Sequence, residues 1–249
     1  MEFRLFPFPS GTLITPFFKH EDSGRFTRYF HKVGSDQPRE INVSLSHGEI
    51  VIDGPESEIR IIQKPNRRQI LSYLSRHDFC SEFNHYVRRT VVVPTFPMSQ
   101  EEALIKTIIR QVIRAKQART LFSRFACSFG CRVAGAFCFP CRKRLLNISV
   151  EQLRMIGLGM KAERIHRALP LLPQEGLSDF SMLGGIGNWS NQVMRVETLC
   201  DYSNYPFWDM SGFAIEQKLG LHLQDIVRTE PILAAGLYVY AASFLESRL

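Results

Sequence analysis

The second half of the chain carries apolar residues at intervals of three and four positions, the period of a helix with one buried face. The clearest series consists of Ile105, Ile108, Ile109 and Val112, continued by Ala115 or Lys116. Ser99, with Glu102 three residues later, has the pattern of a capping box and predicts where this helix begins. Shorter helical patterns cover Glu151–Ile156 and Lys161–Leu169. The apolar segment Pro231–Leu249 predicts a last helix that closes the core.

The N-terminal part mixes strand-like and helical patterns. Strand-like runs lie at Phe3–Phe8, Thr12–Phe18, Ile41–Ser46, Ile50–Ile52 and Ile59–Ile62. Helical patterns predict helices over Ser23–Lys32 and Arg67–Arg76, and the proline-containing segment Val91–Pro97 indicates a crossing into a second region. We therefore predict the α+β fold class, with an α+β domain over residues 1–93 and a helical region over residues 94–249.

The composition is that of an ordinary globular protein, with 45% hydrophobic and 22% charged residues among 249. A net charge of +7 favours a polyanionic partner such as nucleic acid, because cationic side chains displace its condensed counterions. No apolar run approaches the roughly 18 residues that a membrane span needs, and the N-terminus lacks the pattern of a signal peptide. We expect a monomer in the cytoplasm, associated with the nucleoid, with no membrane partner.

The cysteines allow two interpretations. They are Cys80, Cys127, Cys131, Cys138, Cys141 and Cys200. Four of them, from Cys127 to Cys141, are spaced closely enough to hold zinc or an iron–sulfur cluster, since soft thiolates are ligands for both. In a reducing compartment, free thiols, buried or exposed, are the favoured interpretation of the same residues. A bound metal is the alternative, because the x3 spacing from Cys127 to Cys131 matches no assignable metal pattern.

The segment Leu183–Ser190, which reads Leu-Gly-Gly-Ile-Gly-Asn-Trp-Ser, predicts a tight hairpin between helical patterns. Gly185 and Gly187 have no side chains, so the backbone N–H groups there can approach an anionic phosphate oxygen. Trp189 follows at once, and Asp209 comes 20 residues after it, behind an aromatic segment. Gly-x-Gly also occurs in ordinary helix–helix turns, and an aspartate in that place also suits the N-cap of a following helix.

With these motifs the chain resembles the helix-hairpin-helix Gly-Pro-Asp superfamily of DNA glycosylases, and most of all its 3-methyladenine DNA glycosylase II type. The resemblance covers roughly residues 95–245, where Glu102–Gln111, Ser149–Leu158 and Lys161–Ile165 precede the hairpin in the same order. It implies an N-terminal sheet-and-helix domain followed by a two-lobed all-helical domain, with the helix-hairpin-helix motif at about 176–200.

The resemblance implies monofunctional excision of damaged, alkylated purine bases from double-stranded DNA by base flipping and hydrolysis of the N-glycosidic bond. Asp209 is the implied catalytic carboxylate, because it supplies negative charge where the sugar becomes cationic. Bifunctional relatives carry a nucleophilic lysine where this chain has Trp189, so no lyase activity is expected. The base pocket is expected to include Trp189, Tyr205, Phe207 and Trp208.

DNA contact is implied for the glycines of the hairpin and for the end of the first apolar helix. Val112 stands where relatives insert a wedge into the duplex, although core packing suits it equally. Lys106, Arg110 and Arg114 share one helical face, which is either a solvated face or a phosphate-binding one. No cofactor is required. A structural K⁺ or Na⁺ ion could be held by the backbone carbonyls of Ser181, Leu183 and Gly185.

Two other functions remain open from the sequence. One is a non-catalytic, glycosylase-like protein that recognises distorted DNA, and the other is a glycosylase for hypoxanthine or oxidised bases. The chain departs from the alkylation-repair pattern at Val193, where relatives carry an aromatic residue, and at Trp208, where they carry an acidic or small one. The preferred base is therefore not decided by the sequence.

Overall fold

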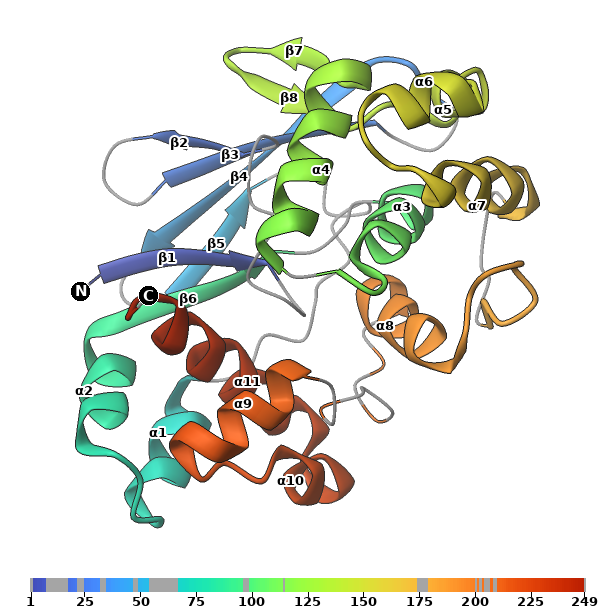
Figure 1. Cartoon of the computed structure of the whole chain (residues 1–249). Coiled ribbons are helices and arrows are strands. Elements are labelled where there is room, and N and C mark those ends of the chain that lie inside the picture. The colour runs from blue at the N-terminus through green and yellow to red at the C-terminus, as the bar shows by residue number, and fades with distance from the viewer. Residues whose placement is uncertain are drawn as a thin grey trace. The chain divides into compact units, whose positions relative to one another are not determined.

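The protein is described from a computed structural model of the whole chain (Figure 1). The residues that the structure describes are 2–7, 18–21, 25–31, 35–46, 49–53, 67–95, 99–113, 115–173, 179–199, 201, 203, 207 and 210–248.

Contacts divide the chain into two compact units, each built from separated segments. Unit 1 contains Met1–Gly11, Ile61–Phe96 and Arg195–Leu249, and unit 2 contains Thr12–Arg60 and Pro97–Met194. Each unit thus takes segments from both sides of the domain boundary that the sequence indicates near residue 93, and that boundary stays a prediction.

Among the described residues, unit 1 combines a parallel pair of strands with five complete helices. Strand β1 (Glu2–Pro7) pairs in parallel with β6 (Thr90–Thr95), so that Glu2 is opposite Thr90. The helices are α1 (Arg67–Ser75), α2 (Ser81–Arg89), α9 (Met210–Leu219), α10 (Leu223–Thr229) and α11 (Pro231–Glu246). Figure 1 shows α1, α2, α9 and α10 arranged around α11.

The core of unit 1 is centred on α11, which is apolar over nearly its whole length. Its Tyr238 is buried, and its Phe244 ring lies 5.5 Å from that of Phe83 on α2. Ser243 shares a hydrogen bond of 2.7 Å with the hydroxyl of Tyr86, which also comes from α2. The sequence prediction of a final core helix is therefore confirmed.

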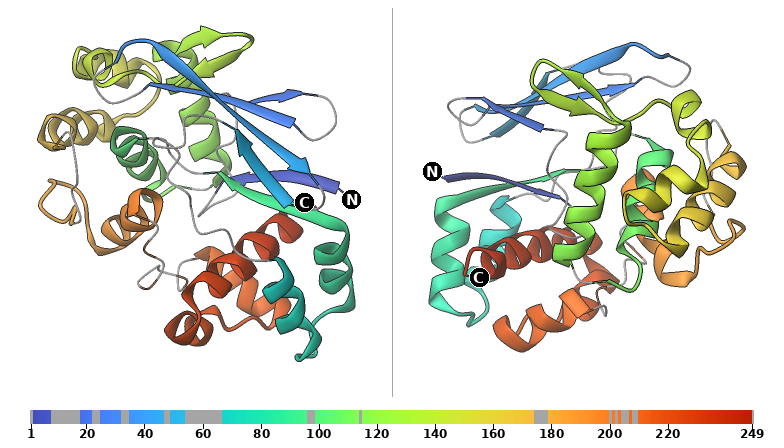
Figure 2. Two further views of the ribbon diagram at one scale, coloured as in Figure 1. Left: turned by 180° about the vertical axis from the view of Figure 1, so that it is seen from behind. Right: turned by 45° about the horizontal axis from the view of Figure 1, so that its top comes forward.

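Unit 2 begins with an antiparallel sheet of four strands in chain order. These are β2 (Phe18–Glu21), β3 (Arg25–His31), β4 (Pro38–Ser46) and β5 (Glu49–Asp53). A separate antiparallel hairpin consists of β7 (Cys131–Val133) and β8 (Ala136–Cys138). Figure 2 shows this hairpin beside β3, and β8 contacts β3 directly.

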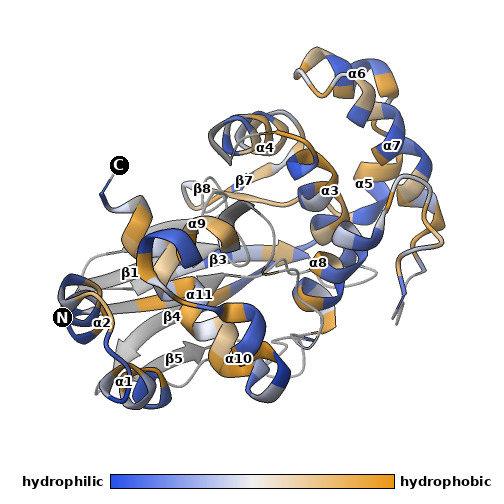
Figure 3. Cartoon of the chain, turned by 60° about the horizontal axis from the view of Figure 1, so that its bottom comes forward, coloured by the Kyte–Doolittle hydropathy of each residue, from blue (hydrophilic) through white to orange (hydrophobic). Residues whose placement is uncertain are grey.

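The remaining elements of unit 2 are helical. They are α3 (Gln100–Arg110), α4 (Ala115–Phe129), α5 (Arg142–Leu146), α6 (Val150–Met155), α7 (Met160–Ala168), the 3₁₀ turn η2 (Leu169–Leu171) and the start of α8 (Asn188–Leu199). Helix α7 carries both hydrophobic and hydrophilic residues (Figure 3), and its Ala162, Ile165 and Ala168, which are spaced by three positions, are buried. This one-sided pattern holds α7 against the core of the unit.

The core of unit 2 forms where α3 meets α4. Every residue of α3 except Glu101 is buried, including the apolar pair Ile105 and Ile108. Phe122 and Phe125 of α4 stack with Phe139 at ring separations of 6.3 and 5.7 Å.

Ser99 caps α3 as predicted, since its hydroxyl accepts the N–H of Glu102 at 3.1 Å. The Glu102 carboxylate, however, forms a buried ion pair with Arg28 of β3. This pair links the sheet of unit 2 to its helices.

The sequence identified most elements correctly. Strands overlapping Phe3–Phe8, Ile41–Ser46 and Ile50–Ile52 are present, as is the helix expected over Arg67–Arg76. The helices expected over Glu151–Ile156 and Lys161–Leu169 correspond to α6 and α7. Most of Thr12–Phe18 and all of Ile59–Ile62 lie outside the described residues. Helices with small sheets make this an α+β fold, as predicted.

Two predictions about elements are wrong. Residues expected to form a helix over Ser23–Lys32 form strand β3, where aromatic and β-branched residues pair with both neighbouring strands. The single helical series from Ile105 to Lys116 is broken, because α3 ends at Arg110 and α4 begins at Ala115. The β7–β8 hairpin was not predicted, since its Ala134–Gly135 turn lacks the usual Asn-Gly signal.

Within the described residues, no helix combines the length and the apolar character needed to cross a bilayer.

Candidate nucleic-acid interface

The glycine segment of unit 2 folds into consecutive tight turns before α8. The N–H of Leu183 donates to the carbonyl of Phe180, and the N–H of Ile186 donates to that of Leu183, both at 3.0 Å. Leu183 and Ile186 are buried in the core, whereas Gly185 is exposed with a φ of 88°. The apolar residues therefore anchor the hairpin while the glycines face outward.

Backbone donors are available at the tip of this hairpin. In the described part of the chain, the N–H groups of Gly185 and Gly187 have no hydrogen-bond partner. The carbonyl of Gly187 accepts the N–H of Asn191 at 2.9 Å, so Gly187 stands directly before α8, and Gly185 precedes it by two residues. A helix N-terminus with free N–H groups is suited to bind an anion such as phosphate.

The end of α3 is fastened to this hairpin through one amide side chain. Gln111 donates from Nε2 to the carbonyl of Gly185 at 3.0 Å and to the hydroxyl of Ser190 at 2.9 Å. Its Oε1 accepts from Arg164 of α7 at 2.9 Å. The aliphatic part of Arg164 lies where a Cβ on Gly185 would make contact. Gln111 thus connects the end of α3, the glycine hairpin and α7.

Lys161 of α7 caps the C-terminal end of α3. Its Nζ donates to the carbonyl of Ile109 at 2.6 Å and also to the carbonyl of Gln111. A cation here is favoured by the negative end of the helix dipole. Burial, together with the nearby charge of Arg164, nevertheless lowers the pKa of Lys161 to about 8.

Val112 projects from this fastened helix end. It has a φ of 57°, a conformation that is a genuine outlier for a β-branched residue. Its side chain is 98% exposed. The core-packing interpretation of Val112 is therefore wrong, because a side chain so fully exposed is not part of the core of its unit. An exposed apolar side chain on a strained backbone is a feature of functional sites.

The basic residues on α3 differ from the solvated face that the sequence allowed. Lys106 and Arg110 are buried, so that interpretation is wrong for both. The Arg110 guanidinium lies over the ring of Trp189, 5.4 Å from the ring centroid, in a cation–π contact. Trp189 itself is half-buried, while Arg114 lies outside the described residues.

The three carbonyls expected to hold a K⁺ or Na⁺ ion are partly engaged. The carbonyl of Leu183 accepts from Ile186, and that of Gly185 accepts from Gln111. Each carbonyl oxygen has a second lone pair, so the set can fit an ion only by sharing. Binding of K⁺ or Na⁺ by the carbonyls of Ser181, Leu183 and Gly185 therefore stays a prediction.

The expected catalytic segment belongs to unit 1, and most of it lies outside the described residues. This applies to Tyr205, Trp208 and Asp209. Helix α9 begins at Met210, where the sequence predicts a helix start. Phe207 is buried with its ring 5.6 Å from that of Tyr238, so in this structure it packs in the core.

Two contacts within unit 1 involve described residues on either side of this segment. Arg195 at the end of α8 binds the Asp201 carboxylate at 2.6 Å. A hydrogen bond from Ser203 and this ion pair lower the pKa of Asp201, which keeps the carboxylate ionised. Further on, Gly212 of α9 lies directly against the backbone of Phe207, where a Cβ would overlap the Phe207 carbonyl.

The cysteine cluster is only partly assembled. Cys131 and Cys138 face each other across the β7–β8 hairpin, and His31 of β3 joins them. Cys127 is exposed and Cys141 is half-buried, and neither belongs to this group. Burial, reinforced by Cys131, raises the pKa of the Cys138 thiol, and burial lowers the pKa of His31.

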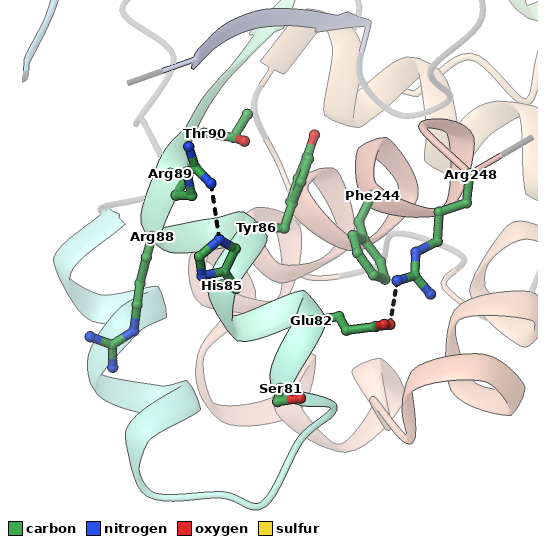
Figure 4. Close-up of a pocket in the computed structure, with 9 residues that line it drawn as sticks. All are labelled: Ser81, Glu82, His85, Tyr86, Arg88, Arg89, Thr90, Phe244 and Arg248. Carbon is green, nitrogen blue, oxygen red and sulfur yellow. Dashed lines mark hydrogen bonds and ion pairs between the residues drawn. The ribbon is translucent and has the colours of Figure 1, made fainter.

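A large cavity lies elsewhere, in unit 1 between α2 and the end of α11. Its volume is about 950 Å³. Figure 4 shows Arg248 paired with Glu82 and Arg89 directed at His85, with Arg88 pointing away. It contains none of the site residues predicted from the sequence. Its one carboxylate, that of Glu82, is already paired with Arg248.

The sequence missed the supporting residues of the interface. Lys161, Arg164 and Gln111 occur in segments that resemble the superfamily, yet their mutual contacts join residues about 50 positions apart. No periodic pattern indicates such contacts. The only local signal is the position of Gln111 at the end of a helical series.

In fold, the chain is similar to solved structures of DNA glycosylases. A 3-methyladenine DNA glycosylase from Archaeoglobus fulgidus matches with a TM-score of 0.68 and 19% identity, over 95% of this chain and 93% of that one. MBOgg1 in complex with a low affinity DNA ligand matches with a TM-score of 0.65 and 17% identity, over 97% and 91%.

An 8-oxoguanine glycosylase/lyase from Clostridium acetobutylicum, in complex with double-stranded DNA containing cytosine opposite 8-oxoguanine, also matches. Its TM-score is 0.60 at 13% identity, over 92% of this chain and 88% of that one. No protein-family model and no curated protein matches the sequence. At these identities the solved structures establish the fold alone.

Proposed function

We propose that this protein is a monofunctional DNA glycosylase that excises alkylated purine bases from double-stranded DNA. The observation that carries the proposal is Val112, an exposed apolar side chain held in a left-handed conformation at the fastened end of α3. A rigid apolar wedge beside a phosphate-binding hairpin is what base flipping requires, because the extruded base leaves a gap in the stack.

The parts of the interface have complementary roles in this proposal. Backbone N–H groups of Gly185 and Gly187 bind a phosphate, and the start of α8 adds its positive dipole. Gln111 sets the distance between that phosphate and Val112, because it bonds both to the hairpin and to Arg164. The wedge therefore enters the duplex at a fixed offset from the bound backbone.

Asp209 is the proposed catalytic group. As the base leaves with the electron pair of the glycosidic bond, C1′ of the sugar becomes cationic, and a nearby carboxylate stabilises that charge. Water then adds to C1′, and the carboxylate accepts the proton that the water loses. The base is the leaving group, and an abasic site remains.

The absence of lyase activity follows in this proposal from the hairpin sequence. No lysine occurs from Leu183 to Ser190, and Trp189 takes the place of the nucleophilic amine of bifunctional relatives. Without an amine there is no Schiff base and no β-elimination. Trp189 offers an aromatic face, which suits electron-poor alkylated bases. The contact of Arg110 with that ring would have to open or shift for a base to stack there.

The test is base release from methylated duplex DNA, with strand breaks scored before and after alkali. Wild type is expected to release methylpurines and to give breaks only after alkali. Asp209→Asn is expected to lower the single-turnover rate by several orders of magnitude while retaining DNA binding. Asp225→Asn, which changes an exposed aspartate of α10, is the matched control and should excise normally.

Each other outcome identifies a different function. Tight binding without release from methylated or hypoxanthine-containing duplexes would indicate a non-catalytic protein that recognises distorted DNA. Release of hypoxanthine or an oxidised base alone would change the substrate class. Strand breaks without alkali would contradict the monofunctional mechanism.

A further inference from the structure

Three metal-binding side chains of unit 2 meet outside the proposed DNA interface. His31 comes from the end of β3, and Cys131 and Cys138 lie opposite each other on β7 and β8. The two Sγ atoms and a ring nitrogen of His31 all lie within 4.8 Å of one another. The separation between Cys131 Sγ and His31 Nε2 is 3.8 Å.

These separations suit a tetrahedral ion. Zinc binds thiolate sulfur at about 2.3 Å and imidazole nitrogen at about 2.0 Å, which places neighbouring ligand atoms roughly 3.5–3.8 Å apart. The observed distance between Cys131 and His31 is close to that range. The other two pairs of ligand atoms lie within 4.8 Å, so they have to approach by about 1 Å at most to share one centre.

The surroundings also suit a bound ion. Cys138 is buried beside Tyr29 and Ala136, with Val133 packed against them, so one side of the group is apolar. His31 Nδ1 has no well-formed hydrogen bond within the described residues, but the backbone of Gln37 lies close to the ring. Metal-bound histidines usually donate their second ring N–H to such a backbone group.

We propose that His31, Cys131 and Cys138 bind one zinc ion, with solvent as the fourth ligand. Two sulfurs and an imidazole select zinc over hard cations such as Mg²⁺ or Ca²⁺. The ion ties the β7–β8 hairpin to the four-stranded sheet. It thus cross-links segments about 100 residues apart. The site lies outside the proposed DNA interface, and the inference does not depend on the proposed glycosylase activity.

A titration of the reduced full-length protein with Co²⁺ tests this site. Wild type is expected to bind one Co²⁺ and to show the sulfur-to-cobalt charge-transfer band together with tetrahedral d–d absorption. Zn²⁺ should displace the Co²⁺ and raise Tm. Cys131→Ser and His31→Asn should each weaken binding at least tenfold, and Cys131→Ser should reduce the charge-transfer band.

Cys127→Ser is the matched control, because Cys127 is an exposed cysteine of the neighbouring α4 and lies outside the group. It should bind Co²⁺ as wild type does. Far-UV circular dichroism of each variant separates loss of the site from loss of the fold. The proposal is overturned by an absent charge-transfer band, or by a band that survives Cys131→Ser. A Cys131–Cys138 disulfide found by mass spectrometry in protein isolated without reductant would also overturn it.

Discussion

At the scale of single residues, the backbone conformation of Val112 is unfavourable for stability but suits the role that we propose for this residue. A left-handed conformation costs a non-glycine residue roughly 1–2 kcal/mol, and Val112 recovers nothing through packing because it is 98% exposed. The surrounding contacts of Gln111 and Lys161 hold the backbone in place. Selection for stability alone would favour another residue there.

Replacing Val112 therefore separates stability from activity. Val112→Gly removes the proposed wedge and the backbone strain together, so the free energy of unfolding should stay level or rise. Base release under single-turnover conditions should fall at least tenfold. Urea unfolding and excision kinetics measure the two effects. Met155→Ala, which trims another exposed apolar side chain, should change neither; equal excision by Val112→Gly and wild type would exclude the wedge.

Lys161 makes the same helix end sensitive to pH. Its pKa is about 8 in the folded protein and 10.5 for an ordinary lysine, so the unfolded chain retains the proton over that interval. Because the unfolded state then binds more protons, the contribution of Lys161 to the free energy of unfolding rises as pH increases from about 8 to 10.5. Its partial exposure makes the effect modest.

Urea unfolding of wild type and Lys161→Met at pH 7.5 and pH 10 measures this contribution. The unfolding free energy of wild type minus that of Lys161→Met should increase from pH 7.5 to pH 10. Lys218→Met, at an exposed lysine of α9, is the control and should show a constant difference from wild type. A constant difference for Lys161→Met as well would contradict the lowered pKa.

At the scale of elements, α9 carries its own constraint through Gly212. A methyl group at this position would overlap the carbonyl of Phe207, and backbone cannot yield as a side chain can. Gly212→Ala should therefore displace the segment between Phe207 and Met210, which includes Asp209. We expect a destabilisation of about 1–3 kcal/mol and a larger loss of base release than that destabilisation explains.

Thermal unfolding and single-turnover excision, measured on the same samples, test this effect of Gly212. Gln217→Ala, at an exposed position of α9, is the control and should retain both properties. Normal excision by a destabilised Gly212→Ala protein would show that the position of Asp209 does not depend on this contact.

Elements were predictable wherever one local property dominated. The helix α11 is apolar almost throughout, and α3 starts at a capping serine, so both could be identified from sequence. Strand β3 could not, because pairing with β2 and β4 overrides its weak helical pattern. The break after Arg110 was missed for a similar reason: its cause is the Lys161 and Gln111 contacts, which lie outside any local window.

At the scale of the whole molecule, the sequence indicated the fold class and the glycine hairpin but not the distribution of segments between units. The parallel pairing of β1 with β6 joins residues about 88 positions apart, and neither strand carries a signal of its partner. The proposed zinc site also joins residues that are distant in sequence, since His31 is far along the chain from both cysteines. The sequence shows which types of residue are available for a site, but it does not show which of them lie close together in the fold.

The division into units also sets an order of assembly during synthesis. Unit 2 is complete once Met194 has been made, whereas unit 1 requires β1, β6 and the last helix, α11. Because domains fold as their residues emerge from the ribosome, the unit that bears the hairpin can fold while β1 still waits for α11. Until then β6 lacks its contact with α11. Slow completion of the C-terminal helices would therefore lengthen the time for which the apolar surface of unit 1 is exposed in the nascent chain.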